Sequence, residues 1–259
     1  MIVNLYRHRS YIWRTALSEV RHRYAGAGLG VLWNFVQPLA QILIFTLIFT
    51  KVMAARVEGL GAAYPVWLCA ALLPWAAFSE CLTRCTGAFV ASAQYLRKLP
   101  IPEQVFVAQA ALTSALNLAL SFVLLLAVAL AMGHTPTWHW VLLPIPLVML
   151  IALAFGLGTV LGTLNAFFRD VGQVVPIALQ LGFWLFPIVY HPSFLPDWLR
   201  QLLPWNPVYP SLASIRLLFI NGVVPGWELW AGMTAWAAAA GILGYAVLRR
   251  LRPELRDVI

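Results

Sequence analysis

The sequence predicts an all-α polytopic membrane protein, on the evidence of its composition, its apolar segments and the placement of its basic residues. Hydrophobic residues make up 62% of the 259 positions and charged residues only 10%, too little polar surface for a soluble domain of this length. Six apolar segments of about membrane-crossing length succeed one another. The net charge of +8 comes from basic clusters between these segments, which is typical of topology signals and argues against a nucleic-acid partner.

Several classes of function lack their signatures. Cys69, Cys81 and Cys85 are too few for a disulfide framework, and no histidine lies near them to complete a metal site. There is no GxxxxGK[ST] phosphate loop, HExxH or GxSxG. We therefore expect no catalytic residue, no metal and no cofactor bound by this chain. Glu80 is the one candidate for a proton relay within a span, and Arg84 one turn later offers it a partner. An ATPase partner is the better explanation for uphill transport.

Residues 4–24 are predicted to form a basic amphipathic helix. Tyr6, Trp13, Leu17, Val20 and Tyr24 recur on one face, and Arg7, Arg14, Ser18 and Arg21 on another. Such a helix before a spanning segment lies in the membrane interface, with its arginines at lipid phosphates. The alternative is a solvated helix that only obeys the charge rule. A small-residue hinge, 25–30, follows.

The six predicted spans are separated by segments rich in glycine, proline and charge. Pro74 is predicted to break the second span, and Pro176 and Pro187 the fifth, because proline removes a backbone donor. The spans cover 31–50, 64–83, 104–132, 141–164, 171–190 and 228–248.

The basic residues predict the orientation. If the N-terminus is inside, only Lys51, Arg56, Arg200 and Arg216 of the 17 Lys and Arg lie outside, leaving 13 inside. The positive-inside rule then places both termini in the cytosol.

Two connecting segments are unusual. In the predicted cytoplasmic loop 84–103, Ala88 to Leu99 can form a short helix ended by Pro100, which would either dock into a cytosolic partner or act as an interfacial linker. The outer segment 191–226 is apolar but broken by prolines, so each half is too short to span. Re-entrant half-helices and a compact external cap both remain open.

Polar and aromatic side chains within the spans suggest a path. Gln109, Thr113, Asn117 and Ser121 form a stripe along the third span, which either holds helices together or lines a pathway. Phe183, Trp184, Phe186 and Tyr190 crowd the outer half of the fifth span. Aromatic rings suit the C–H faces of sugars, although core packing and interface anchoring are equally ordinary uses.

Four stretches in register resemble one family. They are RYAGAGLGVLWNFVQPLAQILIFTLIFTKV (23–52), SAQYLRKLPIPE (92–103), LGTLNAFFRDVGQVVPIALQLGFWLFPIVY (161–190) and LLPWNPVYPSLASIRLLFI (202–220). Together they resemble the membrane (permease) subunit of bacterial polysaccharide ABC exporters, the ABC-2 class that includes Wzm and KpsM. The LGxLW and NxxFRD sequences, the latter with Asn165, Arg169 and Asp170, look more like O-antigen exporters than capsule exporters.

The resemblance implies a single transmembrane domain over 1–259 that forms a homodimer in the bacterial inner membrane. Two cytosolic subunits would bind ATP and Mg, and the cargo would be a lipid-linked polysaccharide moved to the periplasm. Residues 4–24 resemble the interface helix, 25–30 the gate loop at the lipid entrance, and 191–226 the paired periplasmic helices. The coupling helix that docks into the ATPase would use Ser92, Gln94, Tyr95, Leu96, Arg97 and Lys98.

The residues and the resemblance together support a hypothesis for transport. A lipid pyrophosphate would meet arginines at the cytosolic interface, since planar guanidinium suits phosphate. The candidates for the head group and gate are Arg21, Arg23, Tyr24, Gly26, Gly28 and Arg169. The candidates for sugar contact in the pore are Trp33, Gln109, Thr113, Asn117, Ser121, Trp184, Phe186 and Tyr190. Alternatives are a capsular or teichoic-acid-type exporter, an ABC-2 drug or lipid permease, and a membrane-embedded lipid-sugar transferase.

Overall fold

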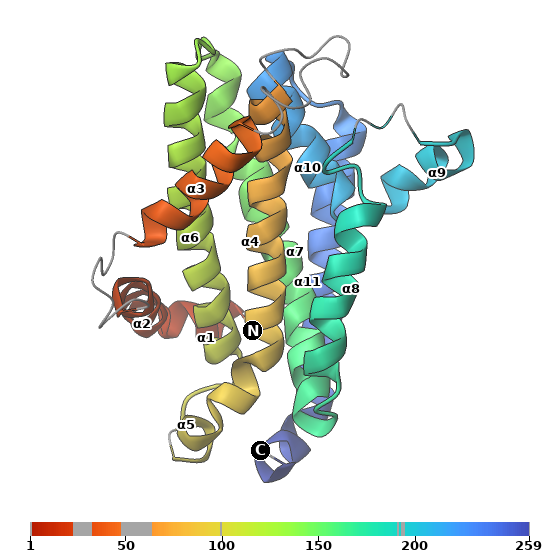
Figure 1. Cartoon of the computed structure of the whole chain (residues 1–259). Coiled ribbons are helices and arrows are strands. Elements are labelled where there is room, and N and C mark those ends of the chain that lie inside the picture. The colour runs from red at the N-terminus through yellow and green to blue at the C-terminus, as the bar shows by residue number, and fades with distance from the viewer. Residues whose placement is uncertain are drawn as a thin grey trace.

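A computed structural model of the chain describes residues 2–22, 33–47, 64–98, 100–190, 192 and 195–258. These residues contain helices and turns but no strand, so the predicted all-α class is confirmed for them. The long helices run alongside one another in an elongated bundle, while α1 and α2 lie across its side (Figure 1). The helix α5 and the C-terminal end lie at one end of the bundle.

The helices follow the apolar segments of the sequence, with short elements at the junctions. They are α1 (Ile2–Arg7), α2 (Arg9–His22), α3 (Trp33–Leu47), α4 (Tyr64–Ala91), α5 (Ala93–Lys98), α6 (Gln104–Ala131), η4 (Trp138–Leu142), α7 (Pro144–Phe167), α8 (Val171–Leu185), α9 (Asp197–Leu202), η6 (Leu203–Trp205), α10 (Tyr209–Arg216), η7 (Leu217–Asn221) and α11 (Trp227–Val258).

Within the described ranges, four helical segments are long and apolar enough to cross a membrane: Pro65–Ala91, Gln104–Ala131, Trp138–Phe167 and Trp227–Leu255. They correspond to the predicted second, third, fourth and sixth spans. The helix α8 is a shorter apolar helix at the position of the fifth span, and α3 lies within the first. The chain is therefore a multi-pass membrane protein, and the count of six spans stays a prediction.

Two of the three predicted proline breaks are wrong. The helix α4 continues through Pro74, and α8 continues through Pro176. In an apolar environment a helix retains its remaining backbone hydrogen bonds, because neighbouring groups can satisfy a carbonyl that proline leaves without a donor. The helix α8 does end at Leu185, two residues before Pro187.

The predicted interface helix is two helices, α1 and α2, joined at His8. The buried residues of α2 are Ile12 and Ala16, and α2 packs against α6. Tyr6 and Trp13, predicted to share the apolar face, are 67% and 50% exposed. The helix α2 therefore packs on the bundle through small and aliphatic side chains, while the rings of Tyr6 in α1 and Trp13 in α2 lie outward; the location of these helices in the membrane interface stays a prediction.

The helix predicted over Ala88–Leu99 begins later. The helix α4 extends to Ala91, and the separate short helix α5 covers only Ala93–Lys98. The amide of Leu96 donates to the carbonyl of Ser92 at 2.9 Å, which starts α5 directly after the turn. Residues 84–91, predicted to lie in the loop, therefore belong to the long helix.

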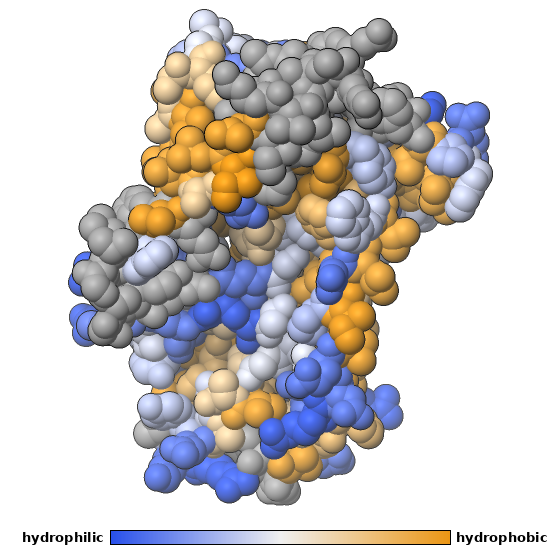
Figure 2. Space-filling view, in the orientation of Figure 1, coloured by the Kyte–Doolittle hydropathy of each residue, from blue (hydrophilic) through white to orange (hydrophobic). Residues whose placement is uncertain are grey.

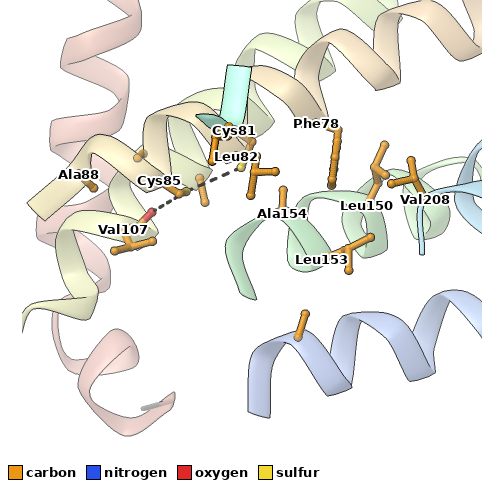
Figure 3. Close-up of a cluster of buried hydrophobic side chains, with 14 of the residues drawn as sticks. Phe78, Cys81, Leu82, Cys85, Ala88, Val107, Leu150, Leu153, Ala154 and Val208 are labelled. Carbon is orange, nitrogen blue, oxygen red and sulfur yellow. Dashed lines mark hydrogen bonds between the residues drawn. The ribbon is translucent and has the colours of Figure 1, made fainter. Parts of the chain in front are cut away.

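The centre of the bundle is α7, which packs between α4 and α11 with little space for side chains. A Cβ added at Gly158 would lie 2.3 Å from the Cβ of Cys85, and one at Gly156 would lie 2.5 Å from the backbone of Ala240. Small residues allow membrane helices to approach this closely. Figure 3 shows the buried side chains at this junction, where the Cys85 thiol donates to the Val107 carbonyl at 3.6 Å. Cys69, Cys81 and Cys85 are all free and buried.

Candidate functional site

A cavity of about 490 Å³, open to the surface, lies between α4 and α8. It combines aromatic rings with hydroxyl, amide and charged groups, a mixture that is unusual on the flank of an apolar bundle. Its lining residues are Trp75, Ser79, Glu80, Thr83, Arg84, Pro176, Leu179, Gln180 and Phe183. Figure 2 shows residues of intermediate and hydrophilic character down the middle of this face, in the region where α4 and α8 run in Figure 1.

Helical periodicity explains why these side chains meet. Trp75, Ser79 and Thr83 follow one another at four-residue spacing, so they occupy one face of α4. Pro176 and Gln180 repeat the same spacing on α8. The two faces oppose each other across the cavity, and this cavity (hereafter the inner cavity) becomes the main candidate for a path through the protein.

An ion cluster borders the inner cavity. Arg84 contacts Glu19 of α2 through a direct ion pair, and its second nitrogen lies 3.8 Å from a carboxylate oxygen of Glu80. The predicted partnership of Glu80 and Arg84 is therefore confirmed. The side chains are about one-quarter to one-third exposed (24% for Arg84, 26% for Glu80 and 36% for Glu19), so water weakens each attraction. The cluster connects α2 to the wall of the inner cavity.

The polar stripe of α6 joins this cluster. The Thr113 hydroxyl donates to Glu19 at 3.0 Å, and the Asn117 amide donates to Glu80 at 3.2 Å. The sequence left open whether the stripe holds helices together or lines a path. At Thr113 and Asn117 it connects helices, and the lining of the inner cavity comes from α4 and α8. Gln109 and Ser121, on the same helix, are half-buried.

A ring pair marks the outer end of the inner cavity. Trp75 and Phe186 meet edge to face, with ring centroids 5.1 Å apart. A Cβ added at Gly182 would lie 3.2 Å from Trp75 and 3.3 Å from Phe186, so the missing side chain gives both rings room. Phe186 also borders a second cavity of about 260 Å³, the outer cavity, with Trp67 and Tyr209 among its lining residues.

A buried arginine holds the wall of the outer cavity. Arg216 of α10 is 8% exposed, and its guanidinium lies 3.5 Å above the ring of Trp67. It also donates to the backbone carbonyls of Pro187 and Ile188, directly after the end of α8. The guanidinium satisfies carbonyls that have left the helix, as irregular backbone inside a membrane protein requires. The orientation prediction counted Arg216 among the basic residues of the outer segments, but its side chain is buried and has a structural role.

The predicted aromatic contacts are distributed over several surfaces. Phe186 lines the outer cavity, whereas Trp184 is 65% exposed. The hydroxyl of Tyr190 donates to the carbonyls of Trp184 and Leu185, both at 3.1 Å, and so closes the end of α8. Trp33 is 38% exposed at the start of α3. Among the aromatic residues of α8, the ring in the inner cavity is that of Phe183.

The predicted head-group residues lie on separate elements. Arg21 is exposed in the last turn of α2, and Arg169 is exposed in the turn between α7 and α8. The predictions for Arg23, Tyr24, Gly26 and Gly28, and the hinge 25–30, fall outside the described residues.

The predicted coupling segment presents polar side chains at one end of the bundle. Gln94, Arg97 and Lys98 are exposed, and Tyr95 is 59% exposed. Leu96 is only 2% exposed and belongs to the main buried cluster. Ser92 forms the half-buried turn that precedes α5. Leu96, with the partly buried Ala93, therefore anchors a helix whose remaining side chains are exposed.

The NxxFRD sequence has a structural role. Asn165 is 5% exposed, and its amide donates to the carbonyl of Thr86 at 3.1 Å. Its carbonyl oxygen accepts from the backbone amide of Gly172 at 2.8 Å. One side chain therefore joins α7, α4 and the first turn of α8.

Sequence reasoning missed most of the inner cavity. It named Glu80 as a candidate for a proton relay and Arg84 as its helical partner, and it did not single out Trp75, Ser79, Thr83 or Gln180. The four-residue spacing of Trp75, Ser79 and Thr83 was an available signal. Their position opposite α8 required the packing of the two helices.

Four helical segments of membrane-crossing length, with a mixed polar and aromatic cavity between α4 and the shorter α8, define a multi-pass membrane protein. Residues 10–220 match the ABC-2 type transporter family, and the chain belongs to this family.

Its relatives include polysaccharide permeases. The chain is 29% identical over 248 residues to the O-antigen export system permease protein RfbA of Myxococcus xanthus, covering 93% of this chain and 94% of the relative. It is 26% identical over 242 residues to a protein of the same description from Klebsiella pneumoniae, covering 93% and 92%. It is 27% identical over 212 residues to the polysialic acid transport protein KpsM of Escherichia coli, covering 82% and 80%.

Proposed function

We propose that this chain is the permease subunit of an ATP-driven exporter that moves a lipid-linked polysaccharide of O-antigen type from cytosol to periplasm. The observation that carries this proposal is the likeness to O-antigen export permeases over 93% of the chain. Identity spread over almost the full length, rather than over one motif, favours a common transport task.

The chemistry of the inner cavity suits this cargo. Trp75 and Phe183 offer ring faces for sugar C–H groups, while Ser79, Thr83 and Gln180 offer hydrogen bonds to hydroxyls. These groups can contact sugars with different arrangements of hydroxyls. Such tolerance is needed if a polymer of repeating sugars is to move past them. The outer cavity continues the same kind of surface beyond the ring pair of Trp75 and Phe186.

The assembly is a homodimer of this single-domain subunit with two ATPase subunits. ATP and Mg bind in the ATPase subunits, and this chain holds no cofactor of its own. The exposed residues of α5 form the coupling helix that docks into the ATPase, with Leu96 as its anchor in the bundle.

The protein lies in the inner membrane with both termini in the cytosol. The basic ends of α2, α5 and α11 then lie on the cytosolic side, as the positive-inside rule expects. Residues 191–226 form the periplasmic half-helices, for which α9 and α10 are short enough. Arg21 and Arg169, with Arg23, meet the lipid pyrophosphate at the cytosolic interface.

A second candidate is a capsular polysaccharide exporter. The similarity to the polysialic acid transport protein KpsM over 82% of the chain supports this alternative. It differs from the first proposal in the cargo and not in the architecture.

Deletion of the gene tests the proposed function. We expect the deletion strain to lack the surface polysaccharide and to accumulate lipid-linked polysaccharide in the cytosol. The intact gene should restore the surface polysaccharide. The composition of the accumulated polymer distinguishes O-antigen from capsule. Normal surface polysaccharide of every kind in the deletion strain would contradict the proposal.

A further inference from the structure

The cytosolic end of α11 reaches the same end of the bundle as α5 (Figure 1). There, Nε of Arg252 lies 2.9 Å from a carboxylate oxygen of Glu103. Glu103 immediately precedes α6 and lies five residues after the end of α5. The ion pair therefore connects the C-terminal helix to the short segment between the coupling helix and the third apolar helix.

Arg252 is a charge partner of a buried carboxylate, that of Glu103. The side chain of Glu103 is 2% exposed, whereas that of Arg252 is 52% exposed. A buried carboxylate is costly unless a cation or hydrogen bonds compensate it. The positive end of the α6 dipole contributes, since Glu103 occupies the position before its first residue. Loss of the guanidinium would remove a charge partner that burial makes important.

Apolar packing accompanies the ion pair. Leu96 of α5, Phe106 of α6 and Leu255 of α11 belong to one contiguous buried cluster, with exposures of 2%, 4% and 0%. Leu255 lies one turn beyond Arg252, so the same face of α11 supplies the charge and the apolar contact. The end of α11 therefore shares a buried cluster with Leu96 of α5 and does not project as a solvated tail.

From this end, α11 continues into the centre of the bundle. A Cβ added at Gly244 would lie 2.7 Å from the carbonyl oxygen of Gly156 on α7, and one at Gly156 would meet the backbone of Ala240. This backbone-to-backbone contact leaves little freedom for the two helices to slide. A displacement at the end of α11 is therefore passed to α7.

We propose that Glu103 and Arg252 are positioning residues that brace the coupling helix against α11, making the C-terminal helix a second connection between the ATPase and the transmembrane bundle. This inference rests on the proposed function for its transport role. The brace holds α5 in the orientation in which the ATPase moves it and transmits that movement to α7 as well as to α4 and α6.

The first test measures the brace without any cargo. The native cysteines are buried, so a thiol-reactive spin label on Tyr95→Cys reports selectively on α5. In the complex with the ATPase subunit, Arg252→Gln should increase the mobility of the label. Arg252→Lys should restore most of the wild-type spectrum because it keeps the charge. Arg249→Gln, a change at an exposed arginine of the same helix, is the matched control and should leave the spectrum unchanged.

The second test measures transport. Arg252→Gln should lower polysaccharide export per ATP hydrolysed by about fivefold, the lower end of typical coupling between sites. Co-purification with the ATPase should remain, because the exposed face of α5 is intact. A purely structural role would lower the yield and thermal stability of the complex without changing this ratio.

The two tests fail in distinguishable ways. If the spectrum and the export ratio of Arg252→Gln both match those of Arg249→Gln, the brace is wrong. If the label becomes mobile while the deletion strain exports its polysaccharides normally, the brace stands and the proposed function fails. Increased mobility with an unchanged export ratio overturns the transport role assigned to the brace.

Discussion

Single side chains connect helices in this bundle at positions where the backbone needs a partner. Asn165 satisfies a carbonyl on α4 and an amide on α8, and Arg216 satisfies two carbonyls after α8 has ended. Both groups are buried, so water cannot substitute for the lost partner. The polar residues that look scattered along the sequence therefore have specific structural tasks.

Asn165→Ala should destabilise the protein by about 1–3 kcal/mol, because it removes the two hydrogen bonds through which this buried side chain joins Thr86 of α4 to Gly172 of α8. Thermal unfolding of the detergent-solubilised protein measures this change. Gln173→Ala, at an exposed position of α8, serves as the control and should unfold with the wild type. Equal melting temperatures for the two variants would contradict the assigned role of Asn165.

Helices in this protein carry different faces for different neighbours. The helix α2 presents Ile12, Ala16 and Glu19 to the bundle and leaves Trp13 outward. The helix α5 buries Leu96 and exposes Arg97 and Lys98. In each case one helix packs on the bundle through one face and leaves another face for a proposed neighbour, the membrane interface for α2 and the ATPase for α5.

Glu19→Gln should loosen α2 from the bundle, because it removes the ion pair with Arg84 while keeping the side-chain shape. A thiol placed at Ala16, which is fully buried, reports this loosening through its rate of maleimide labelling. We expect severalfold faster labelling in the Glu19→Gln background than in the parent. In the control background Ser18→Ala, a change at an exposed position of the same helix, the thiol at position 16 should be labelled at the parent rate. Equal rates in all three backgrounds would exclude the ion cluster as the attachment of α2.

Arg97→Glu combined with Lys98→Glu should weaken assembly with the ATPase subunit, because it reverses both charges on the exposed end of α5. Co-purification at increasing salt measures the loss. Arg249→Glu with Arg250→Glu makes the same change in charge on exposed residues of α11 and should have a smaller effect. Undiminished assembly of the α5 variant would remove these residues from the docking surface.

The whole molecule brings a polar cavity and a ring pair to the seam between α4 and α8. The inner cavity and the Trp75 and Phe186 rings lie along this seam, and the outer cavity, lined mainly by α10 and the residues that follow α8, begins at Phe186. On the opposite side of α4, the packing with α7 is tight enough that Gly158 meets Cys85 directly. A compact wall behind an open seam suits the proposed homodimer, in which each subunit would form half of the path.

Thr83→Trp should obstruct the inner cavity, because Thr83 is exposed on its wall and the indole adds substantial volume to a space of about 490 Å³. We expect reduced surface polysaccharide with unchanged protein level and ATPase co-purification. Thr234→Trp adds the same volume at an exposed position on α11 and should export normally. Normal export by Thr83→Trp would exclude the inner cavity from the path.

The apolar run lengths determined the membrane class, the helices and most of their boundaries, since a bilayer leaves a helix as nearly the only way to satisfy the backbone. The four-residue spacing of Glu80 and Arg84 likewise predicted their pairing, because it depends on one helix alone. The stripe of Thr113 and Asn117 was recognised, but its role depended on Glu19 and Glu80 of other helices. The burial of Arg216, the bracing of Glu103 by Arg252 and the opposition of α4 to α8 follow from contacts distant in sequence. Periodicity specifies which side chains share a face, and only packing specifies what that face meets.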